Sequence, residues 1–213
     1  MSKFDLVDTL YSDLRYMTHA KAKILREVML EEDARTILEI GFAQGKSSAY
    51  IAAVLEDQGE GSLLTIDMQS ATRQSPNIED VLEKLGLSHR VTPLYCKRSY
   101  TWELQRLINA PETPQFDLCF FDGGHTWDST GFGVVLVDML LRPGGVMILN
   151  DLDWSIGRSP YFKNKPKAMA KYDDDEIASE PVRLVRDTIL GKLGYENIRP
   201  QDEIMFGVSR KPF

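Results

Sequence analysis

The sequence is poor in cysteine and contains no long hydrophobic run. Its two cysteines, Cys96 and Cys119, both lie in apolar, strand-like segments, so we expect buried thiols rather than a disulfide, and a cytoplasmic protein. The N-terminus is charged and polar, without the apolar stretch of a signal peptide. No segment approaches the roughly 20 apolar residues that a membrane span requires. We therefore expect no membrane span and a fold that depends on its core rather than on disulfides.

Basic residues are also scarce. Lys and Arg number 25 against 32 Asp and Glu, which gives a formal net charge of −7. Proteins that bind nucleic acids neutralise phosphates with clustered Lys and Arg, so this composition argues against a nucleic-acid partner. It leaves room for a small anionic ligand held by backbone N–H groups.

Apolar segments that are typical of strands alternate with segments of helical periodicity along most of the chain. Strands are predicted at residues 36–41, 61–68, 90–96, 116–122 and 146–151, with two final strands at 195–200 and 204–210. The alternation predicts an α/β fold, a Rossmann-like doubly wound sheet of seven mostly parallel strands with helices on both faces. Pro93 removes a backbone donor from the third strand, which indicates an edge strand or a bulge. The sequence RPGG, residues 142–145, predicts a turn before the fifth strand.

Two segments fall outside this alternation. Residues 1–33 place apolar residues at helical spacing and are predicted to form an N-terminal helical cap. Residues 34–213 form the main domain, and residues 152–179 are too long for an ordinary connection within it. This insertion is rich in lysine first and acidic after, and we expect it to be a lid loop.

Ligands in doubly wound sheets bind beyond the carboxyl ends of the strands. The turn after the first strand places small residues at Gly41, Ala43 and Gly45, which let a backbone approach a ligand. Gly45 follows Gly41 by four residues, so the spacing differs from the dinucleotide pattern G-x-G-x-x-G. Asp67 ends the second strand, where a carboxylate can accept both hydroxyls of a ribose. The alternatives are a tight turn without a ligand, and a helix cap or exposed strand end at Asp67.

Together these features resemble the class I methyltransferases that depend on S-adenosylmethionine (SAM). The turn EIGFAQG, residues 39–45, is similar to the family's first motif E/D-x-G-x-G-x-G, with Ala43 at the middle glycine. Asp67 matches the ribose-binding acid of the family. The sequence LLRPGGVMILND, residues 140–151, resembles the family's turn and fifth strand. The similarity covers roughly residues 34–213 and implies SAM as the cofactor.

The resemblance also implies a set of cofactor-binding residues. They are Glu39, Gly41, Phe42, Ala43, Gly45, Ser47, Asp67, Met68, Ser99 and Asp122. Ser99 falls near the family's adenine-contact position, where Lys97 and Arg98 replace the commoner Gly-Asp. N-terminal helices often close over the cofactor in this family, which would give that role to residues 1–33.

Polar residues end the fourth and fifth predicted strands. Asp122 ends the fourth in FFDGGH, and Asn150 and Asp151 end the fifth. Adjacent parallel strands would bring these side chains to one edge, and three oxygen ligands suit Mg²⁺. The set resembles the metal site of catechol-type O-methyltransferases, with the order Asn-Asp rather than Asp-Asn. Asp122-x-x-His125 resembles macrolide-sugar O-methyltransferases, in which the histidine is the proposed general base.

The resemblance therefore implies a SAM-dependent methyltransferase that modifies a hydroxyl group of a small molecule or sugar, with Mg²⁺ as a candidate second cofactor. Asp122 and His125 would be catalytic, and Asp122, Asn150 and Asp151 would bind the metal. A cation stabilises the alkoxide of the acceptor, and a nearby imidazole takes the proton. Three alternatives stay open, namely a His125 that only orients its loop, a nucleotide-binding oxidoreductase on a related sheet, and a non-catalytic cofactor-binding module. The sequence does not decide the oligomeric state, and a homo-oligomer is left open.

Overall fold

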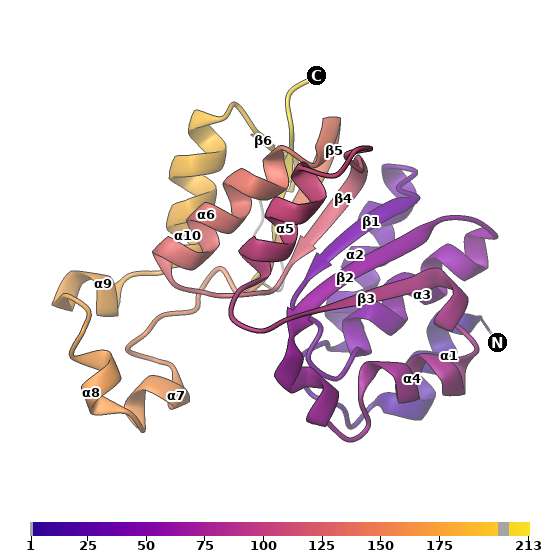
Figure 1. The fold of residues 1–213 in the computed structure, drawn as a ribbon, viewed down its shortest axis with the longest axis horizontal. Helices are drawn as coiled ribbons and strands as arrows, with labels where there is room; N and C mark the ends of the chain where they lie inside the picture. Colours follow the sequence, from indigo (N-terminus) through magenta and orange to yellow (C-terminus); the bar gives the residue numbers. More distant parts are fainter. Residues whose placement is uncertain (1, 200–204) are drawn as a thin grey trace.

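The computed structural model of the chain describes residues 2–199 and 205–213. In this described part seven strands form one sheet with the order β3-β2-β1-β4-β5-β7-β6 (Figure 1). The strands are β1 (Thr36–Ile40), β2 (Ser62–Met68), β3 (Val91–Cys96), β4 (Phe116–Phe121), β5 (Leu141–Leu149), β6 (Glu196–Asn197) and β7 (Gly207–Arg210). Strands β1 to β5 are parallel, whereas β7 is antiparallel to β5 and β6 is antiparallel to β7. The predicted α/β fold is confirmed.

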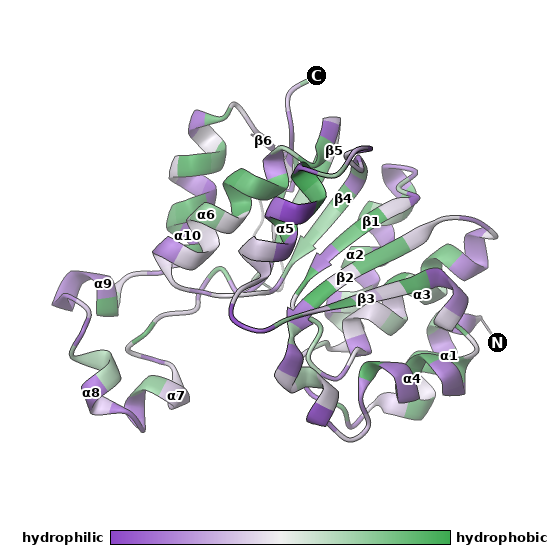
Figure 2. Cartoon of the chain, in the orientation of Figure 1, coloured by the Kyte–Doolittle hydropathy of each residue, from purple (hydrophilic) through white to green (hydrophobic). Residues whose placement is uncertain are grey.

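Helices cover both faces of the sheet (Figure 1). They are α1 (Lys3–Tyr11), α2 (His19–Glu31), α3 (Lys46–Gln58), η1 (Gln69–Arg73), α4 (Ile78–Leu85), η2 (Ser88–Arg90), α5 (Tyr100–Ile108), α6 (Trp127–Asp138), α7 (Pro160–Lys163), α8 (Pro166–Met169), α9 (Asp174–Ala178), α10 (Pro181–Leu184) and η3 (Val185–Leu190). Helices α1 to α4 pack into one hydrophobic core, and α5, α6 and α10 pack into the other. Along β4, Leu118 and Phe120 belong to the first core, and Cys119 and Phe121 belong to the second. The central strands are therefore apolar on both faces, and they are mainly green in Figure 2.

Local sequence features account for where elements begin and end. Asn77 caps the start of α4 through a capping box with Asp80, and Gly86 ends the helix with a φ of +68°. Strand β3 lies at the edge of the sheet, as Pro93 indicates. Cys96 and Cys119 are free and buried, which confirms the predicted thiols.

The structure corrects one prediction, the turn at residues 142–145. These residues belong to β5, because the strand continues through a bulge rather than stopping at the Pro-Gly-Gly sequence. The pairing of β4 with β5 shifts in register between Phe116 and Leu118, and Gly144 adopts a φ of +71°. A glycine that tolerates this conformation lets the strand bend and keep its partner.

The two segments outside the alternation also contain regular structure. Residues 2–33 contain α1 and α2, with residues 12–18 between them. Residues 152–179 contain the three short helices α7, α8 and α9, which lie to one side of the main body, in orange in Figure 1. The final strands are shorter than predicted, and residues 200 and 204 of those predictions lie outside the described residues. None of the helices in the described part combines the length and apolar character that crossing a membrane demands.

Candidate active site

A cavity of about 680 Å³ opens at the carboxyl ends of β1, β2, β4 and β5. It spans the gap between β1 and β4, where the strand order of the sheet reverses. Most of the residues that the sequence assigns to a site line this cavity, namely Gly41, Phe42, Ala43, Ser47, Asp67, Met68, Ser99, Asp122, His125, Asn150 and Asp151. Glu39 and Gly45 are not among the lining residues. The structure thus brings the predicted cofactor turn and the predicted acidic cluster to one cavity.

The turn after β1 requires its first glycine for two reasons. Gly41 has a φ of +88°, which a residue with a side chain rarely adopts. A Cβ atom at this position would also lie 2.2 Å from the backbone oxygen of Asp122. The turns after β1 and β4 therefore touch through their backbones, and this contact places Asp122 beside the glycine-rich turn.

Asp67 organises the same turn from the end of β2. Its Oδ2 atom accepts hydrogen bonds from the backbone N–H groups of Phe42 at 2.8 Å and Ala43 at 2.6 Å. Ala43 adopts a φ of +49°, a left-handed conformation that is rare for a residue with a side chain. The carboxylate thus holds a strained turn in place while it lines the cavity.

Ser99 and Glu39 have structural partners in addition to their predicted roles. Ser99 caps the start of α5 by accepting a hydrogen bond from the N–H group of Thr101 at 3.2 Å. Glu39 is fully buried on β1, where its Oε2 atom accepts hydrogen bonds from the hydroxyls of Ser48 and, at 2.6 Å, Thr65. Burial raises the pKa of Glu39 to about 7, although these hydroxyls act to lower it. Glu39 supports the turn from beneath, and its direct contact with a cofactor stays a prediction.

Asp122, His125 and Asp151 form what we name the strand-end cluster. Among the described residues, these three offer ligand atoms that all lie within 4.8 Å of one another. His125 Nε2 lies 3.7 Å from Asp122 Oδ1 and 3.4 Å from Asp151 Oδ2. These are ion-pair distances, and the buried Nε2 atom makes no hydrogen bond within the described part of the chain. The cluster joins the ends of the adjacent strands β4 and β5, as the sequence predicts.

The backbone around the cluster is tightly constrained. A Cβ atom on Gly123 would lie 2.8 Å from the Ile40 side chain, which explains a glycine directly after Asp122. Asp151, just past the end of β5, adopts a φ of +56°, which is a left-handed backbone conformation. Strained residues of this kind concentrate at functional sites, and three of them, Tyr16, Ala43 and Asp151, line this cavity.

The charged groups of the cluster change one another's pKa values. Burial acts to lower the pKa of His125, but the two carboxylates outweigh it and raise the pKa to about 9. Burial raises the pKa of Asp122, and His125 offsets only part of this effect. Burial acts in the same direction on Asp151, but His125 and Lys21 outweigh it and lower the pKa of Asp151 to about 2. The cluster therefore holds a protonated imidazole between two acids at neutral pH.

Lys21 is a member of this site that the sequence analysis misses. Its ammonium group donates hydrogen bonds to Asn150 Oδ1 at 2.7 Å and to Asp151 Oδ1 at 3.0 Å. These residues supply two of the three oxygen donors that the sequence assigns to Mg²⁺. By distance alone a cation fits between Asp122, His125 and Asp151. The arrangement of the donors does not suit it, because an ammonium already takes an oxygen from both Asn150 and Asp151.

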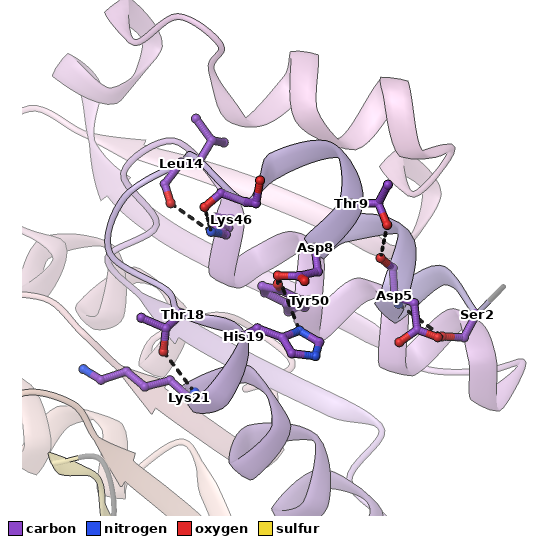
Figure 3. A network of polar contacts seen from close by, with 11 residues as sticks. Ser2, Asp5, Asp8, Thr9, Leu14, Thr18, His19, Lys21, Lys46 and Tyr50 are labelled. Atoms are coloured by element: carbon purple, nitrogen blue, oxygen red, sulfur yellow. Dashed lines mark hydrogen bonds and ion pairs between the residues drawn. The ribbon is translucent and has the colours of Figure 1, made fainter.

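The segment between α1 and α2, residues 12–18, forms one wall of the cavity. Its cavity-lining residues are Arg15, Tyr16 and Met17. Lys46, the first residue of α3, donates hydrogen bonds to the backbone oxygens of Ser12 at 3.3 Å and Leu14 at 2.8 Å (Figure 3). The N-terminal segment is thus tied to the helix that begins at the glycine-rich turn.

An aromatic series leads from the strand-end cluster to the inserted segment. The ring of Trp154 lies 5.3 Å from that of His125 and 6.2 Å from that of Phe162 on α7. Phe162 in turn contacts Tyr172 with ring centroids 5.5 Å apart. The inserted segment therefore reaches the site through Trp154, which lines the cavity.

Comparison with a protein-family model gives a match over residues 38–152, and the description of that family is methyltransferase domain. The match covers more than half of the chain and includes the glycine-rich turn, Asp67, Asp122 and Asp151. No curated protein sequence matches the chain.

Solved structures share the fold at low sequence identity. The O-methyltransferase TomG from Streptomyces achromogenes, involved in tomaymycin synthesis and determined with SAM, is 20% identical with a TM-score of 0.64, covering 100% of this chain and 91% of that one. An O-methyltransferase from Bacillus cereus in complex with SAH is 19% identical with a TM-score of 0.60, covering 90% and 78%. The SAH-bound methyltransferase PaMTH1 from Podospora anserina is 15% identical with a TM-score of 0.60, covering 99% and 86%.

Proposed function

Because the chain belongs to the family of methyltransferase domains, we propose that it transfers the methyl group of SAM to a hydroxyl group of a small molecule or sugar. The observation that carries the proposal is one cavity lined by two chemically different sets of residues. The glycine-rich turn and Asp67 form one set, and the strand-end cluster forms the other. A methyl donor held by the first set and an acceptor held by the second would meet in line, which is mainly a problem of positioning. The SAM and SAH bound to TomG and the Bacillus cereus enzyme support this choice of cofactor.

The first set of residues suits a nucleoside. Asp67 offers a carboxylate at the end of β2, where it can accept hydrogen bonds from ribose hydroxyls. Gly41 has no side chain, so a ligand can approach the backbone there. Met68 and Ser99 line the cavity beside Asp67, where we place the base. Glu39 acts indirectly in this proposal, by holding the strands beneath the turn.

His125 and Asp122 perform the acid–base chemistry in this proposal. The oxygen of the acceptor hydroxyl attacks the methyl carbon of SAM, the carbon–sulfur bond breaks, and neutral SAH leaves. The hydroxyl proton passes to the neutral imidazole of His125, and Asp122 and Asp151 stabilise the resulting imidazolium. No step requires Mg²⁺. The metal that the resemblance implies is tested separately, because activity that survives EDTA excludes it and leaves methyl transfer in place.

The acceptor would be enclosed by the two segments outside the main alternation. Residues 1–33 contribute the wall at residues 12–18, and residues 152–179 contribute Trp154. The ring of Trp154 lies beside that of His125, so an acceptor that reaches the base also meets this aromatic ring. The cytoplasmic location stays a prediction, and the oligomeric state stays open.

Calorimetry with SAH tests the cofactor, and release of SAH from SAM in the presence of a panel of hydroxylated small molecules tests the reaction. We expect SAH to bind, and Asp67→Asn to weaken its affinity by at least about tenfold, or roughly 1.4 kcal/mol. Asp57→Asn is the matched control, since Asp57 is an exposed acid on α3 outside the cavity. No binding to the wild-type protein at about 1 mM SAH would overturn the proposal.

A further inference from the structure

Lys21 occupies an unusual place for a lysine. It lies in the first turn of α2, beside the cap that Thr18 provides through the N–H group of Lys21 (Figure 3). A cation there opposes the helix dipole, so the position does not serve the stability of the helix. The side chain is only 14% exposed, and its ammonium lies 5.5 Å from the centre of the Phe206 ring. A long charged side chain that forgoes solvent in this way needs compensating partners.

The partners of Lys21 are the polar residues that end β5. The ammonium bridges Asn150 Oδ1 and Asp151 Oδ1, at 2.7 and 3.0 Å. Asp151 is then shared, because its other oxygen, Oδ2, faces His125. Lys21 belongs to α2, so the N-terminal cap and the strand-end cluster are joined by a partly buried ion pair across 130 residues of sequence.

A cation already lies against the cluster in the absence of a metal ion. The ammonium of Lys21 is paired with Asp151, and the imidazole of His125 lies between Asp122 and Asp151. A divalent ion bound by Asn150 and Asp151 would have to displace the ammonium of Lys21 or lie directly against it. Like charges at such distances repel strongly when solvent is scarce.

We propose that Lys21 is the resident cation of the strand-end cluster and holds Asn150 and Asp151 in the place of a divalent metal ion. Lys21 is a positioning residue, since it acts through Asp151 on His125 and does not line the cavity. The inference deepens the proposed function and depends on it only for the reaction that Asp151 and His125 serve. The arrangement of the cations is independent of that reaction.

Titration with Mn²⁺, followed by electron paramagnetic resonance on the full chain after EDTA treatment, tests the inference without any turnover. We expect the wild-type protein to show no site tighter than roughly 1 mM. Lys21→Met removes the ammonium but keeps an unbranched side chain, and we expect it to create one Mn²⁺ site per chain that is at least tenfold tighter. Lys23→Met is the matched control, because Lys23 is an exposed lysine on the same helix, and it should behave as the wild type does.

The activity of the same proteins gives a second measurement. Wild-type activity should be unchanged by EDTA, whereas Lys21→Met should lose more than tenfold in EDTA and recover on addition of Mn²⁺ or Mg²⁺. Lys21→Arg keeps a cation and should neither gain a Mn²⁺ site nor respond to EDTA.

A tight Mn²⁺ site in the wild-type protein would overturn the inference, and this titration decides the matter even if Lys21→Met does not fold. A folded Lys21→Met protein that binds no Mn²⁺ would overturn it too, because the oxygens would then not be a masked metal site. Failure of the proposed function would look different. Neither wild type nor variant would bind SAH, while the Mn²⁺ titrations would still separate them.

Discussion

Strand β4 has an aspartate at each end, and the protein holds the two in opposite ways. Asp117, at the amino end, accepts four hydrogen bonds of 2.7 to 2.8 Å. The donors are the backbone N–H groups of Arg35 and Thr36, the hydroxyl of Thr36 and Nε of Arg142. Asp122, just past the carboxyl end, faces His125 at 3.7 Å and lines the cavity. One acid is saturated with donors, and the other is left partly free for chemistry.

The ionisation of the two acids reflects this difference. Burial acts to raise the pKa of Asp117, but its hydrogen bonds outweigh it and hold the pKa below the usual value. Burial raises the pKa of Asp122. The folded state therefore favours the ionised form of Asp117 and disfavours that of Asp122. The comparison shows that the acid at the amino end of β4 stabilises the fold. The acid at the carboxyl end, which lies at the candidate active site, is held in a form that the folded state disfavours.

The largest expected effect comes from removing the imidazole at the carboxyl end. His125→Gln should lower kcat/KM by about 100- to 10,000-fold, because the variant lacks the group that takes the acceptor's proton. In the wild type only the neutral ring can do this. With the pKa of His125 raised to about 9, kcat/KM should rise with pH up to about 9 and level off above it. Steady-state rates of SAH release between pH 6.5 and 10 measure both effects.

A control variant and the pH profile of His125→Gln itself test this prediction. His89→Gln changes an exposed histidine that is paired with Glu56 and does not line the cavity, so it should leave the rates unchanged. A His125→Gln protein that keeps the same rising limb would show that another group accepts the proton. His125 would then only orient its loop.

The next effect should fall on stability at the amino end. Asp117→Asn should lower the free energy of unfolding by about 2 to 3 kcal/mol, because the carboxylate accepts several charge-assisted hydrogen bonds that an amide cannot all replace. Its kcat should stay near the wild-type value, since Asp117 lies at the opposite end of β4 from the cavity. Urea denaturation and initial rates measure the two quantities on the same preparation.

Asp122→Asn should have the opposite effects on stability and activity. Its free energy of unfolding should be unchanged or higher, because the variant removes a charge that the folded state disfavours, while its activity should fall. If both variants lost the same stability, the two ends of β4 would not differ in the way proposed.

The parts of the site that follow strands could be predicted from the sequence. The position of Asp67 or Asp122 is readable because a buried apolar run ends in an acid, and parallel strands bring their carboxyl ends together. The glycine at position 41 is readable for the same reason. Each of these patterns is local in the sequence, and the parallel sheet brings the residues concerned together at one edge.

The contributions of the N-terminal segment could not be predicted. Lys21 and Lys46 look like ordinary helix lysines, and helical periodicity does not say where a helix docks on a sheet. The one signal for Lys21 is weak, namely a cation in the first turn after the Thr18 cap, where the helix dipole disfavours it. The continuation of β5 through residues 142–145 was hidden too, because Pro-Gly-Gly signals a turn whether or not a partner strand follows the bulge.

Low pH should remove the stabilisation that Asp117 provides at the amino end of β4. The pKa of Asp117 is lowered on folding, so its stabilisation is complete above the unfolded value of about 3.9 and is lost as the pH falls through the folded value. The stability gap between the wild type and Asp117→Asn should therefore be constant from pH 7 to 5 and shrink below pH 4. Urea midpoints of both proteins at several pH values measure this gap. A gap that persists at the lowest pH would mean that the amide disturbs packing rather than charge.

The smallest effect should come from the exposed rim of the amino-end site. Arg142 is 40% exposed and supplies only one of the four donors to Asp117, so Arg142→Gln should cost about 1 kcal/mol or less. Raising the salt concentration should narrow this difference further, since a partly exposed ion pair is screened. A loss as large as that of Asp117→Asn would mean that the guanidinium, not the backbone N–H groups of β1, holds the acid. The contrast along β4 would then rest on paired charges at both ends, Arg142 with Asp117 and His125 with Asp122, and not on the number of hydrogen bonds that each acid accepts.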